Sequence, residues 1–96
     1  MDIVTIKLES ERILLKRIIA LPYDTVHIHN GRVYVNDQIV DEIPTEYSGL
    51  ADTPYTLGEG EYFVLGDNRS NSLDSRYPDV GIIKKDQICE KIIYVN

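Results

Sequence analysis

Apolar and polar residues alternate along the first part of this chain with a period of two. Val4, Ile6 and Leu8 are separated by polar residues, and this pattern predicts a half-buried β-strand. Residues 12–20 then form a nearly continuous aliphatic run, which is typical of a strand covered on both faces. The chain therefore opens with two predicted strands joined by a short polar connector.

Two tight turns are expected in the next segment. Asn30-Gly31 lies between two alternating runs, at residues 26–28 and 33–35. Asn-Gly in this position is the strongest short-range signal for a hairpin, because both residues must adopt positive φ. A second tight turn is expected at residues 36–38, before another short apolar pair. These signals predict short antiparallel strands joined by hairpins.

The second half of the chain is less regular. Residues 41–60 hold two of the four prolines and three of the six glycines, so they are expected to form a long loop. The last strands are expected at residues 62–65 and 88–95, and no segment has helical periodicity. The pattern predicts an all-β fold, a small antiparallel sandwich or partly open barrel, with residues 1–96 as a single domain.

Composition narrows the classes of function. The chain has 96 residues, of which 43% are hydrophobic and 27% charged, as in one small globular domain. Its formal net charge of −6 argues against nucleic-acid binding, which depends on a positive surface. The single cysteine, Cys89, rules out an internal disulfide and is expected to be a small buried residue. His27 and His29 share a strand face, but without further ligands they predict no metal site.

The apolar segments are too short to cross a membrane. The longest is interrupted by Lys16 and Arg17, whereas a spanning helix needs roughly 20 predominantly apolar residues. Met1-Asp2 opens directly on strand-like sequence, so no signal peptide is expected. We therefore expect the chain itself to be soluble.

Two segments carry unusual chemistry. Residues 66–76 contain two Asp, two Arg, two Asn and three Ser between apolar segments, which suits a loop held in shape by its own side chains. Upstream, Lys16 lies among aliphatic residues, and burial lowers the pKa of a lysine so that it can act as a base. The alternative is that Lys16 is an ordinary strand lysine with its amine in solvent.

Together the two segments resemble the type I signal peptidases, the serine–lysine endopeptidases that remove signal peptides from secreted preproteins. Residues 66–76 match the family's GDNRxxSxDSR element at every fixed position. Residues 16–24 match its KRxxGLPGD element except at Ala20 and Tyr23, where the family has glycine. If that glycine supplies a positive φ, Tyr23 must adopt an unusual backbone angle or distort the turn. The resemblance also implies the all-β fold that signal peptidases share with self-cleaving repressors.

The resemblance implies roles for the polar residues of both segments. Lys16 takes the place of the general base that accepts the proton of the nucleophilic serine. Ser72 takes the place of the serine that orients the lysine amine, although a turn serine bonded to the backbone is the alternative. The residues implied to support the site without transferring protons are the ion pairs Arg17–Asp67 and Asp74–Arg76 and the loop residues Asn68, Arg69 and Ser75.

Substrate binding is implied to use the backbone of the lysine strand. In the family the signal peptide lies extended and pairs with this strand as an added strand. Leu15 is implied to line a shallow pocket for a small side chain upstream of the cut. Ile3 and Val4 are further candidates for such a pocket, but ordinary core packing is the preferred interpretation for both.

The resemblance does not extend to the nucleophile. The start of the chain, residues 2–6, resembles the strand that follows the family's serine segment, and neither that segment nor a membrane anchor has a match. Ser10, Ser48 and Ser70 are available hydroxyls, but none lies in the family's serine context. We therefore expect this chain to be inactive alone. Its parent protein is expected to be anchored in the bacterial cell membrane, with this domain on the extracytoplasmic side.

Three hypotheses for function follow. The first is the catalytic domain of a signal peptidase that retains the base but lacks the nucleophile. The second is a serine-less module that binds signal peptides without cutting them, or a subunit of a split enzyme. The third, a self-cleaving repressor, is disfavoured by the loop at residues 66–76 and by the acidic charge. No cofactor and no nucleic-acid partner are expected, and the strand edge left by the missing segment predicts some self-association.

Overall fold

The fold consists of two antiparallel β-sheets. The computed structural model of the chain describes residues 1–93. The first sheet has the strand order β8-β7-β2-β1-β9, with β1 at Ile3–Lys7, β2 at Ile13–Ala20, β7 at Glu61–Leu65, β8 at Ile83–Lys84 and β9 at Ile88–Lys91. The second sheet has the order β5-β4-β3-β6, with β3 at Thr25–His29, β4 at Arg32–Val35, β5 at Gln38–Ile39 and β6 at Tyr55–Thr56.

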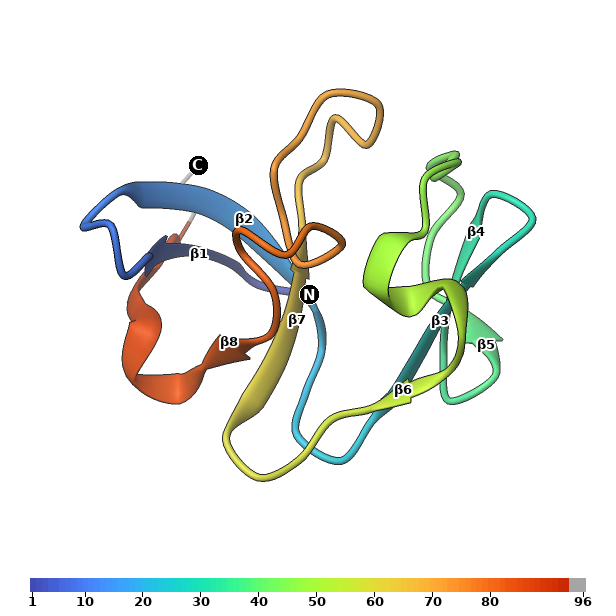
Figure 1. Ribbon diagram of the computed structural model, residues 1–96, viewed down its shortest axis with the longest axis horizontal. Helices are drawn as coiled ribbons and strands as arrows, with labels where there is room; N and C mark the ends of the chain where they lie inside the picture. Colours follow the sequence, from blue (N-terminus) through green and yellow to red (C-terminus); the bar gives the residue numbers. More distant parts are fainter. Residues whose placement is uncertain (94–96) are drawn as a thin grey trace.

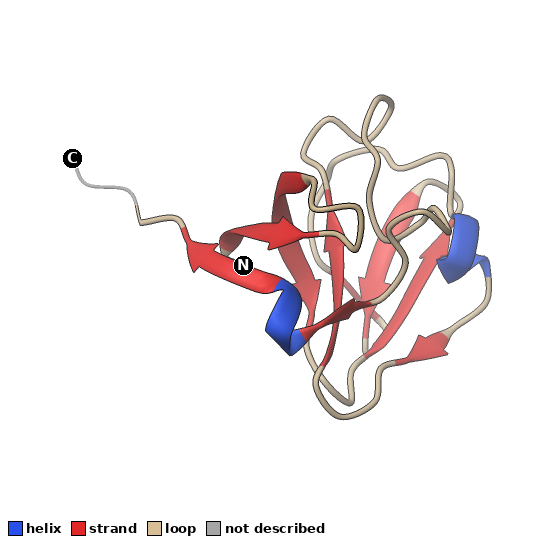
Figure 2. Cartoon of the chain, turned by 60° about the vertical axis from the view of Figure 1, so that its left-hand side comes forward, coloured by secondary structure: helices blue, strands red, loops and turns tan. Residues whose placement is uncertain are grey.

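The two sheets lie beside each other and are joined by the chain that passes from β2 to β3 (Figure 1). Strands make up nearly all the regular structure, and the two helices are single short turns (Figure 2). These are the 3₁₀ helices η1 at Gly49–Asp52 and η2 at Lys85–Gln87. The predicted all-β class is thus confirmed. Within residues 1–93, neither helix has the length or apolar character needed to cross a membrane.

The hydrophobic core has two parts. Residues that pack the two sheets together are Ile19, Ala20, Val26, Ile28, Val33, Ala51, Leu57, Phe63 and Leu65. Residues that cover the other face of the first sheet are Val4, Ile6, Leu8, Leu14, Val64, Val80 and Ile83. Strand β2 contributes Leu14 to one part and Ile19 to the other, so Lys16 lies on the stretch of strand between them.

Both predicted hairpin turns are present. Asn30 and Gly31 have φ of 51° and 74°, and β3 pairs with β4 on either side of them. Asn36 and Asp37 have φ of 52° and 68° and connect β4 to β5. Positive φ at both central residues is the geometry that matches the twist of the flanking strands, so these turns follow directly from the local sequence.

Several details differ from expectation. Strand β2 is not covered on both faces, because Ile13 and Leu15 are 53% and 59% exposed. Cys89 is exposed rather than buried, since it lies on the edge strand β9. Strand β9 ends at Lys91, and residues 94–95 of the predicted last strand lie outside the described residues. Strand β8 is only two residues long, which is too short to leave a periodic pattern.

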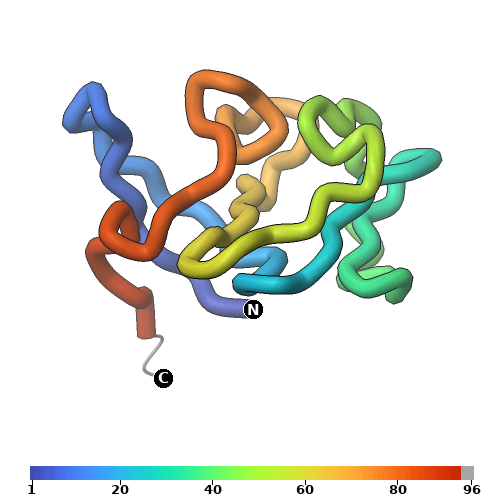
Figure 3. Tube along the Cα trace, turned by 60° about the horizontal axis from the view of Figure 1, so that its bottom comes forward, coloured from blue at the N-terminus to red at the C-terminus, as the bar shows by residue number. Residues whose placement is uncertain are grey.

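Residues 41–60 form a long connection between the hairpins and β7. The connection contains the single turn η1 and the two-residue strand β6, which pairs with β3. Its first part, residues 41–50, rises beside the loop of residues 66–76, as the green and orange segments show in Figures 1 and 3. The connection therefore contributes residues to the surroundings of the second motif.

Of the two alternatives left open for Tyr23, an unusual backbone angle or a distorted turn, the structure shows the first. Its φ is 74° and its side chain is 70% exposed. We expect Tyr23→Gly to raise the free energy of unfolding by up to about 1 kcal/mol, because a left-handed conformation costs a non-glycine residue roughly 1–2 kcal/mol and glycine's greater chain entropy offsets part of that gain. Urea denaturation would measure the change. Tyr23→Ala is the matched control, and an equal gain from alanine would contradict the strain explanation.

Candidate active site

The site is built where the loop after β7 meets the middle of β2. Strands β2 and β7 are neighbours in the first sheet, so the chain that leaves β7 at Leu65 passes close to Lys16. Lys16 Nζ donates a hydrogen bond to Ser72 Oγ at 2.8 Å, although the two residues are 56 positions apart. The structure therefore brings together the lysine and the serine that the sequence singled out from two separate motifs.

The surroundings of Lys16 favour its neutral form. The pKa of the Lys16 amine lies below its usual value mainly because burial disfavours the charged ammonium. The positive charges of Arg12 and Arg76 lower this pKa further, whereas the carboxylate of Asp74 acts in the opposite direction. A lysine that loses its proton more readily is better suited to accept one from a hydroxyl.

Gly66 forms the floor beneath the Lys16–Ser72 contact. A Cβ atom at Gly66 would lie 1.8 Å from Ser72 Oγ and 3.2 Å from Lys16 Nζ. Both peptide groups of Gly66 are also held by side chains of the loop. Its N–H donates to Asp74 Oδ2 at 3.0 Å, and its carbonyl accepts from Arg69 Nε at 2.8 Å. The residue is thus fixed in place and leaves no room for a side chain.

We expect Gly66→Ala to displace Ser72 and to lower the free energy of unfolding by about 1–3 kcal/mol, the usual cost of overpacking a filled site. Chemical denaturation would measure the loss, and the NMR signal of the Lys16 amine would report the changed contact. In the double variant Gly66→Ala/Ser72→Gly the overlapping atoms are gone, so most of the added cost should disappear. Additive costs of the two changes would contradict direct packing of Gly66 on Ser72.

Asp74 and Arg76 form an ion pair that is completely buried. Arg76 Nε and Nη2 each donate to a carboxylate oxygen of Asp74 at 2.8 Å, and both side chains are 0% exposed. Arg76 also donates to the carbonyl oxygens of Arg69, at 3.0 Å, and Tyr47, at 3.2 Å. The pair predicted from the sequence is present, and it ties the loop to the connection that contains Tyr47.

Arg69 makes a second buried link between the same two segments. Its side chain is 1% exposed and donates to Asp41 Oδ2 at 2.8 Å and to Thr45 Oγ1 at 2.9 Å. The sequence identified Arg69 but neither of these acceptors. A buried guanidinium requires acceptors, yet nothing local in the sequence points to partners 24 and 28 positions away.

Arg17 and Asp67 join the lysine strand to the loop at its more exposed side. Arg17 Nε and Nη2 donate to the two carboxylate oxygens of Asp67, both at 2.9 Å. Hydrogen bonding to Arg17 lowers the pKa of Asp67 below its usual value. Arg17 Nη1 also donates to the carbonyl of Met1 at 3.1 Å. The pair thus links strand β2, at the residue after Lys16, to the start of the loop.

The remaining loop residues hold local geometry. Ser75 Oγ accepts a hydrogen bond from the backbone N–H of Val64 at 2.9 Å, which fastens the end of the loop to β7. Asn68 Oδ1 accepts from Ser70 Oγ at 3.1 Å, so its bond lies within the exposed tip of the loop. Ser75 is thus buried at the end of the loop, whereas Asn68 is exposed.

Strand β2 has an open edge next to Lys16. It pairs with β1 over residues 13–17, but its pairing with β7 begins only at Arg17. The backbone N–H of Ile18 donates to the carbonyl of Asp2 on the β1 side at 2.8 Å. Because peptide groups alternate in direction along a strand, those of Leu15 point to the opposite edge. Leu15 therefore offers a backbone donor and acceptor for an added strand.

Leu15 also lines a small pocket beside that edge. The residues around this pocket are Ile3, Leu15, Lys16, Arg17 and Asp67. Val4 is 2% exposed and belongs to the core, as expected, whereas half-buried Ile3 contributes to the pocket wall. The structure thus brings Leu15 and Ile3 together with the lysine and leaves Val4 out.

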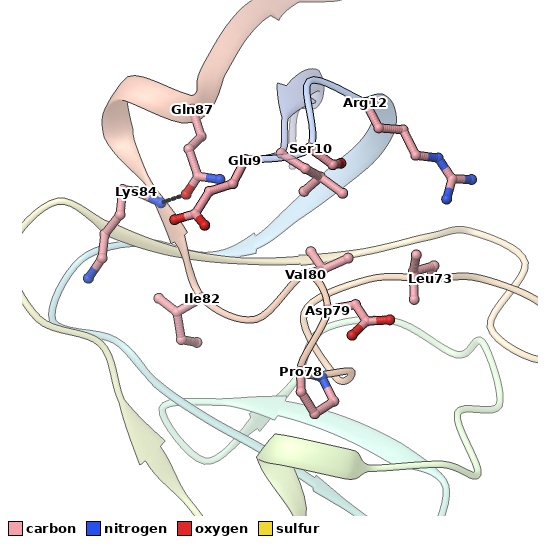
Figure 4. A pocket seen from close by; sticks show the side chains of 11 residues that line it. Glu9, Ser10, Arg12, Leu73, Pro78, Asp79, Val80, Ile82, Lys84 and Gln87 are labelled. Atoms are coloured by element: carbon pink, nitrogen blue, oxygen red, sulfur yellow. Dashed lines mark hydrogen bonds between the residues drawn. The ribbon is translucent and has the colours of Figure 1, made fainter.

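The hydroxyls of Ser10 and Ser48 lie away from the Lys16 amine. Ser10 is on the turn between β1 and β2 and lines a separate pocket of mixed polarity, whose lining side chains do not include Lys16 (Figure 4). In the same pocket wall, the backbone N–H of Lys84 donates to Gln87 Oε1 at 2.9 Å. Ser48 Oγ donates to a carboxylate oxygen of Asp52 at 2.9 Å. Within residues 1–93, the Lys16 amine donates its hydrogen bond to Ser72 and not to Ser10 or Ser48.

The two histidines are stacked on the outer face of the second sheet. Their ring centroids are 5.4 Å apart, and His29 is exposed. Within the part of the chain that the structure describes, no group of three or more His, Cys, Asp or Glu residues could hold a metal ion.

Known proteins resemble this chain in sequence and in fold. The profile of the family described as "Signal peptidase, peptidase S26" matches residues 1–95. Signal peptidase I U of Bacillus subtilis is 42% identical over 78 residues, which cover 71% of this chain and 42% of the relative. Signal peptidase I of Bacillus amyloliquefaciens is 38% identical over 98 residues, which cover 91% of this chain and 52% of the relative.

The crystal structure of a signal peptidase I from Enterococcus faecalis V583 superimposes with a TM-score of 0.73 and 28% sequence identity, covering 96% of this chain and 93% of that chain. The chain spans about half the length, or less, of the curated relatives it matches. Because the profile match covers nearly the whole chain and the fold agrees, the chain belongs to the peptidase S26 family of signal peptidases.

Proposed function

We propose that this chain is the part of a serine-type endopeptidase that removes signal peptides, and that Lys16 is its general base. The observation that carries the proposal is the contact between Lys16 Nζ and Ser72 Oγ in surroundings that lower the pKa of the amine. A neutral amine can accept a proton from a serine hydroxyl while that hydroxyl attacks the scissile carbonyl. Relatives that carry the name signal peptidase I support the substrate class.

Ser72 is assigned to orientation of the amine. Its Oγ accepts a hydrogen bond from Lys16 and packs tightly over Gly66, which limits the movement that an attacking hydroxyl would need. A hydroxyl can accept from an ammonium and donate to a neutral amine, so one geometry serves both protonation states of Lys16. The nucleophile is a serine other than those of the present 96 residues, since Ser10, Ser48 and Ser70 contact other groups or line another pocket.

The substrate binds along the open edge of β2. The peptide groups of Leu15 point toward that edge, and the exposed Leu15 side chain forms a pocket with Ile3. An extended peptide paired here places a carbonyl group next to Lys16, and the pocket accepts a small side chain of the residue before the cut. Membrane anchoring of the parent protein, with this domain on the extracytoplasmic side, would deliver signal peptides to this edge.

The proposal is tested by activity of the chain and of the protein that contains it. The isolated 96-residue chain is expected not to cleave a preprotein, because Ser72 is the hydroxyl that contacts Lys16 among residues 1–93 and it is assigned to orientation. An antibody to this domain would isolate the endogenous protein from cells. A membrane-bound product well above 11.0 kDa that cleaves the same preprotein is the expected result.

Two results would contradict the proposal. Turnover by the isolated chain that disappears in Lys16→Ala would show that the nucleophile lies within these residues. A soluble endogenous product of 11.0 kDa without peptidase activity would favour a signal-peptide-binding module or a subunit of a split enzyme.

A further inference from the structure

A groove lies between the first part of the long connection and the loop of residues 66–76. It has a volume of about 550 Å³. The residues that line it are Ile43, Pro44, Glu46, Tyr47, Asp67, Asn68, Arg69, Ser70 and Tyr77. Figures 1 and 3 show these two segments rising side by side. Lys16, Ser72 and Leu15 do not line this groove, so the proposed catalysis and upstream binding give it no role.

Buried bonds hold both walls of the groove in a defined position. Arg69 donates to Asp41 and Thr45 at the start of one wall, and Arg76 donates to the carbonyl of Tyr47 farther along it. Thr45 is fully buried, and the two arginine side chains are 1% and 0% exposed. Breaking such charged hydrogen bonds in a buried setting costs much free energy. The two segments that line the groove are therefore fixed relative to each other.

The groove continues from the proposed substrate edge. Asp67 lines both the groove and the pocket that contains Leu15 and Lys16. Because Asp67 pairs with Arg17, the groove begins at the Arg17 end of the lysine strand. The order along the strand is therefore Leu15, Lys16, then the mouth of the groove. A peptide whose upstream residues lie at Leu15 and whose scissile bond lies at Lys16 would run next into the groove.

The lining of the groove favours a positively charged side chain. Within residues 1–93, Arg69 is paired with Asp41 and Asp67 with Arg17, whereas the exposed carboxylate of Glu46 has no ion-pair partner. Next to Glu46, the ring of Tyr47 stacks on Tyr77 with centroids 4.8 Å apart and remains 49% exposed. A free carboxylate next to a partly exposed aromatic residue attracts an ammonium or guanidinium group by charge and by cation–π attraction.

We propose that this groove binds the segment of the substrate polypeptide that follows the scissile bond, and that Glu46 and Tyr47 select a lysine or arginine side chain in it. The inference rests on the proposed peptidase function and adds a specificity site on the other side of the cut from Leu15. Binding there would hold the scissile bond in register with Lys16 from both directions, which lowers the entropic cost of positioning it.

The test uses the isolated ¹⁵N-labelled chain, which is expected to bind peptides without cutting them. One synthetic peptide carries an Ala-x-Ala sequence followed by six residues that include lysine, and a second peptide ends at the last alanine. The longer peptide is expected to shift the amide signals of Leu15, Lys16, Tyr47 and Ser70. The shorter peptide is expected to shift only those of Leu15 and Lys16.

The outcomes separate the inference from the proposed function. Shifts at Leu15 and Lys16 with unchanged signals at Tyr47 and Ser70 would overturn the groove assignment and leave the proposed function intact. No shift at either place with millimolar peptide would contradict both. Shifts in the groove from the shorter peptide would show that the upstream segment occupies it, which would also overturn the assignment.

The charge preference has its own control. Replacing the lysine of the longer peptide by glutamate is expected to weaken binding by about three- to five-fold, the range typical of an exposed charge contact. Glu46→Gln should remove this discrimination. Glu59→Gln removes an exposed carboxylate outside the groove and should leave it unchanged. Discrimination that survives Glu46→Gln would overturn the role of Glu46.

Discussion

Lys16→Arg is expected to lower the kcat/KM of the active, serine-containing protein by at least about 10²- to 10⁴-fold, the usual contribution of general-base catalysis. Arginine keeps the positive charge and much of the side-chain volume, but it stays protonated at any working pH and cannot accept a proton. The partly buried surroundings that lower the pKa of Lys16 would therefore hold a permanent cation. Cleavage of a preprotein, followed by gel electrophoresis, would measure the loss.

The pH dependence of the unmutated protein follows from the same shift. Only the neutral amine is a base, so activity should rise as pH increases through the pKa of Lys16 and level off above it. Because burial lowers that pKa, activity should rise at a pH below the usual lysine pKa of 10.5. Lys7→Arg is the matched control, since Lys7 lies in the same hairpin with a 49% exposed side chain paired with Glu11. Full activity of Lys16→Arg, or an equal loss in Lys7→Arg, would contradict the assignment.

Asp74→Ala is expected to lower the free energy of unfolding by about 3–5 kcal/mol, which is a large part of the stability of a domain of this size. The reason is that Arg76 would remain completely buried without its counter-charge. The change also removes the acceptor of the Gly66 N–H, so the floor of the Lys16–Ser72 contact would loosen. Urea denaturation monitored by circular dichroism would measure the effect.

Asp79→Ala is the control for loss of an acidic residue nearby, because Asp79 is exposed, and its expected change is within about 0.5 kcal/mol. The double variant Asp74→Leu/Arg76→Met should recover part of the loss, since it removes both buried charges. If Asp74→Ala costs no more than Asp79→Ala, the buried pair does not stabilise the loop as described.

Local sequence predicted the elements whose geometry is decided within a few residues. The two hairpin turns appear at Asn30-Gly31 and Asn36-Asp37 because their residues tolerate positive φ. For Tyr23 the motif left open a positive φ or a distorted turn, and the structure has the positive φ. Expectations that depended on the neighbours of a strand were less successful. The exposure of Leu15 and Cys89 is decided by where pairing stops and by which strand lies at the edge.

For the candidate site, too, the sequence predicted some features and not others. Its polar residues could be found from two motifs, and the distance between Lys16 Nζ and Ser72 Oγ agrees with the pairing that the resemblance implied. The acceptors of Arg69 could not be found, because Asp41 and Thr45 lie in an irregular connection without a periodic signal. The roles of these residues in catalysis and positioning stay predictions until the variants above are measured.

The sequence alone predicted the strands other than β6 and β8, the tight turns, the all-β class and the residues that form the two motifs. It could do so because periodicity, turn propensity and motif spacing are local properties. The tertiary structure adds what depends on distant segments meeting. It buries Asp74 and Arg76 together, packs Ser72 over Gly66 beside Lys16, and forms the groove along Tyr47. Burial and long-range contact set the pKa of the lysine and the shape of the groove, and neither quantity exists until the chain has folded.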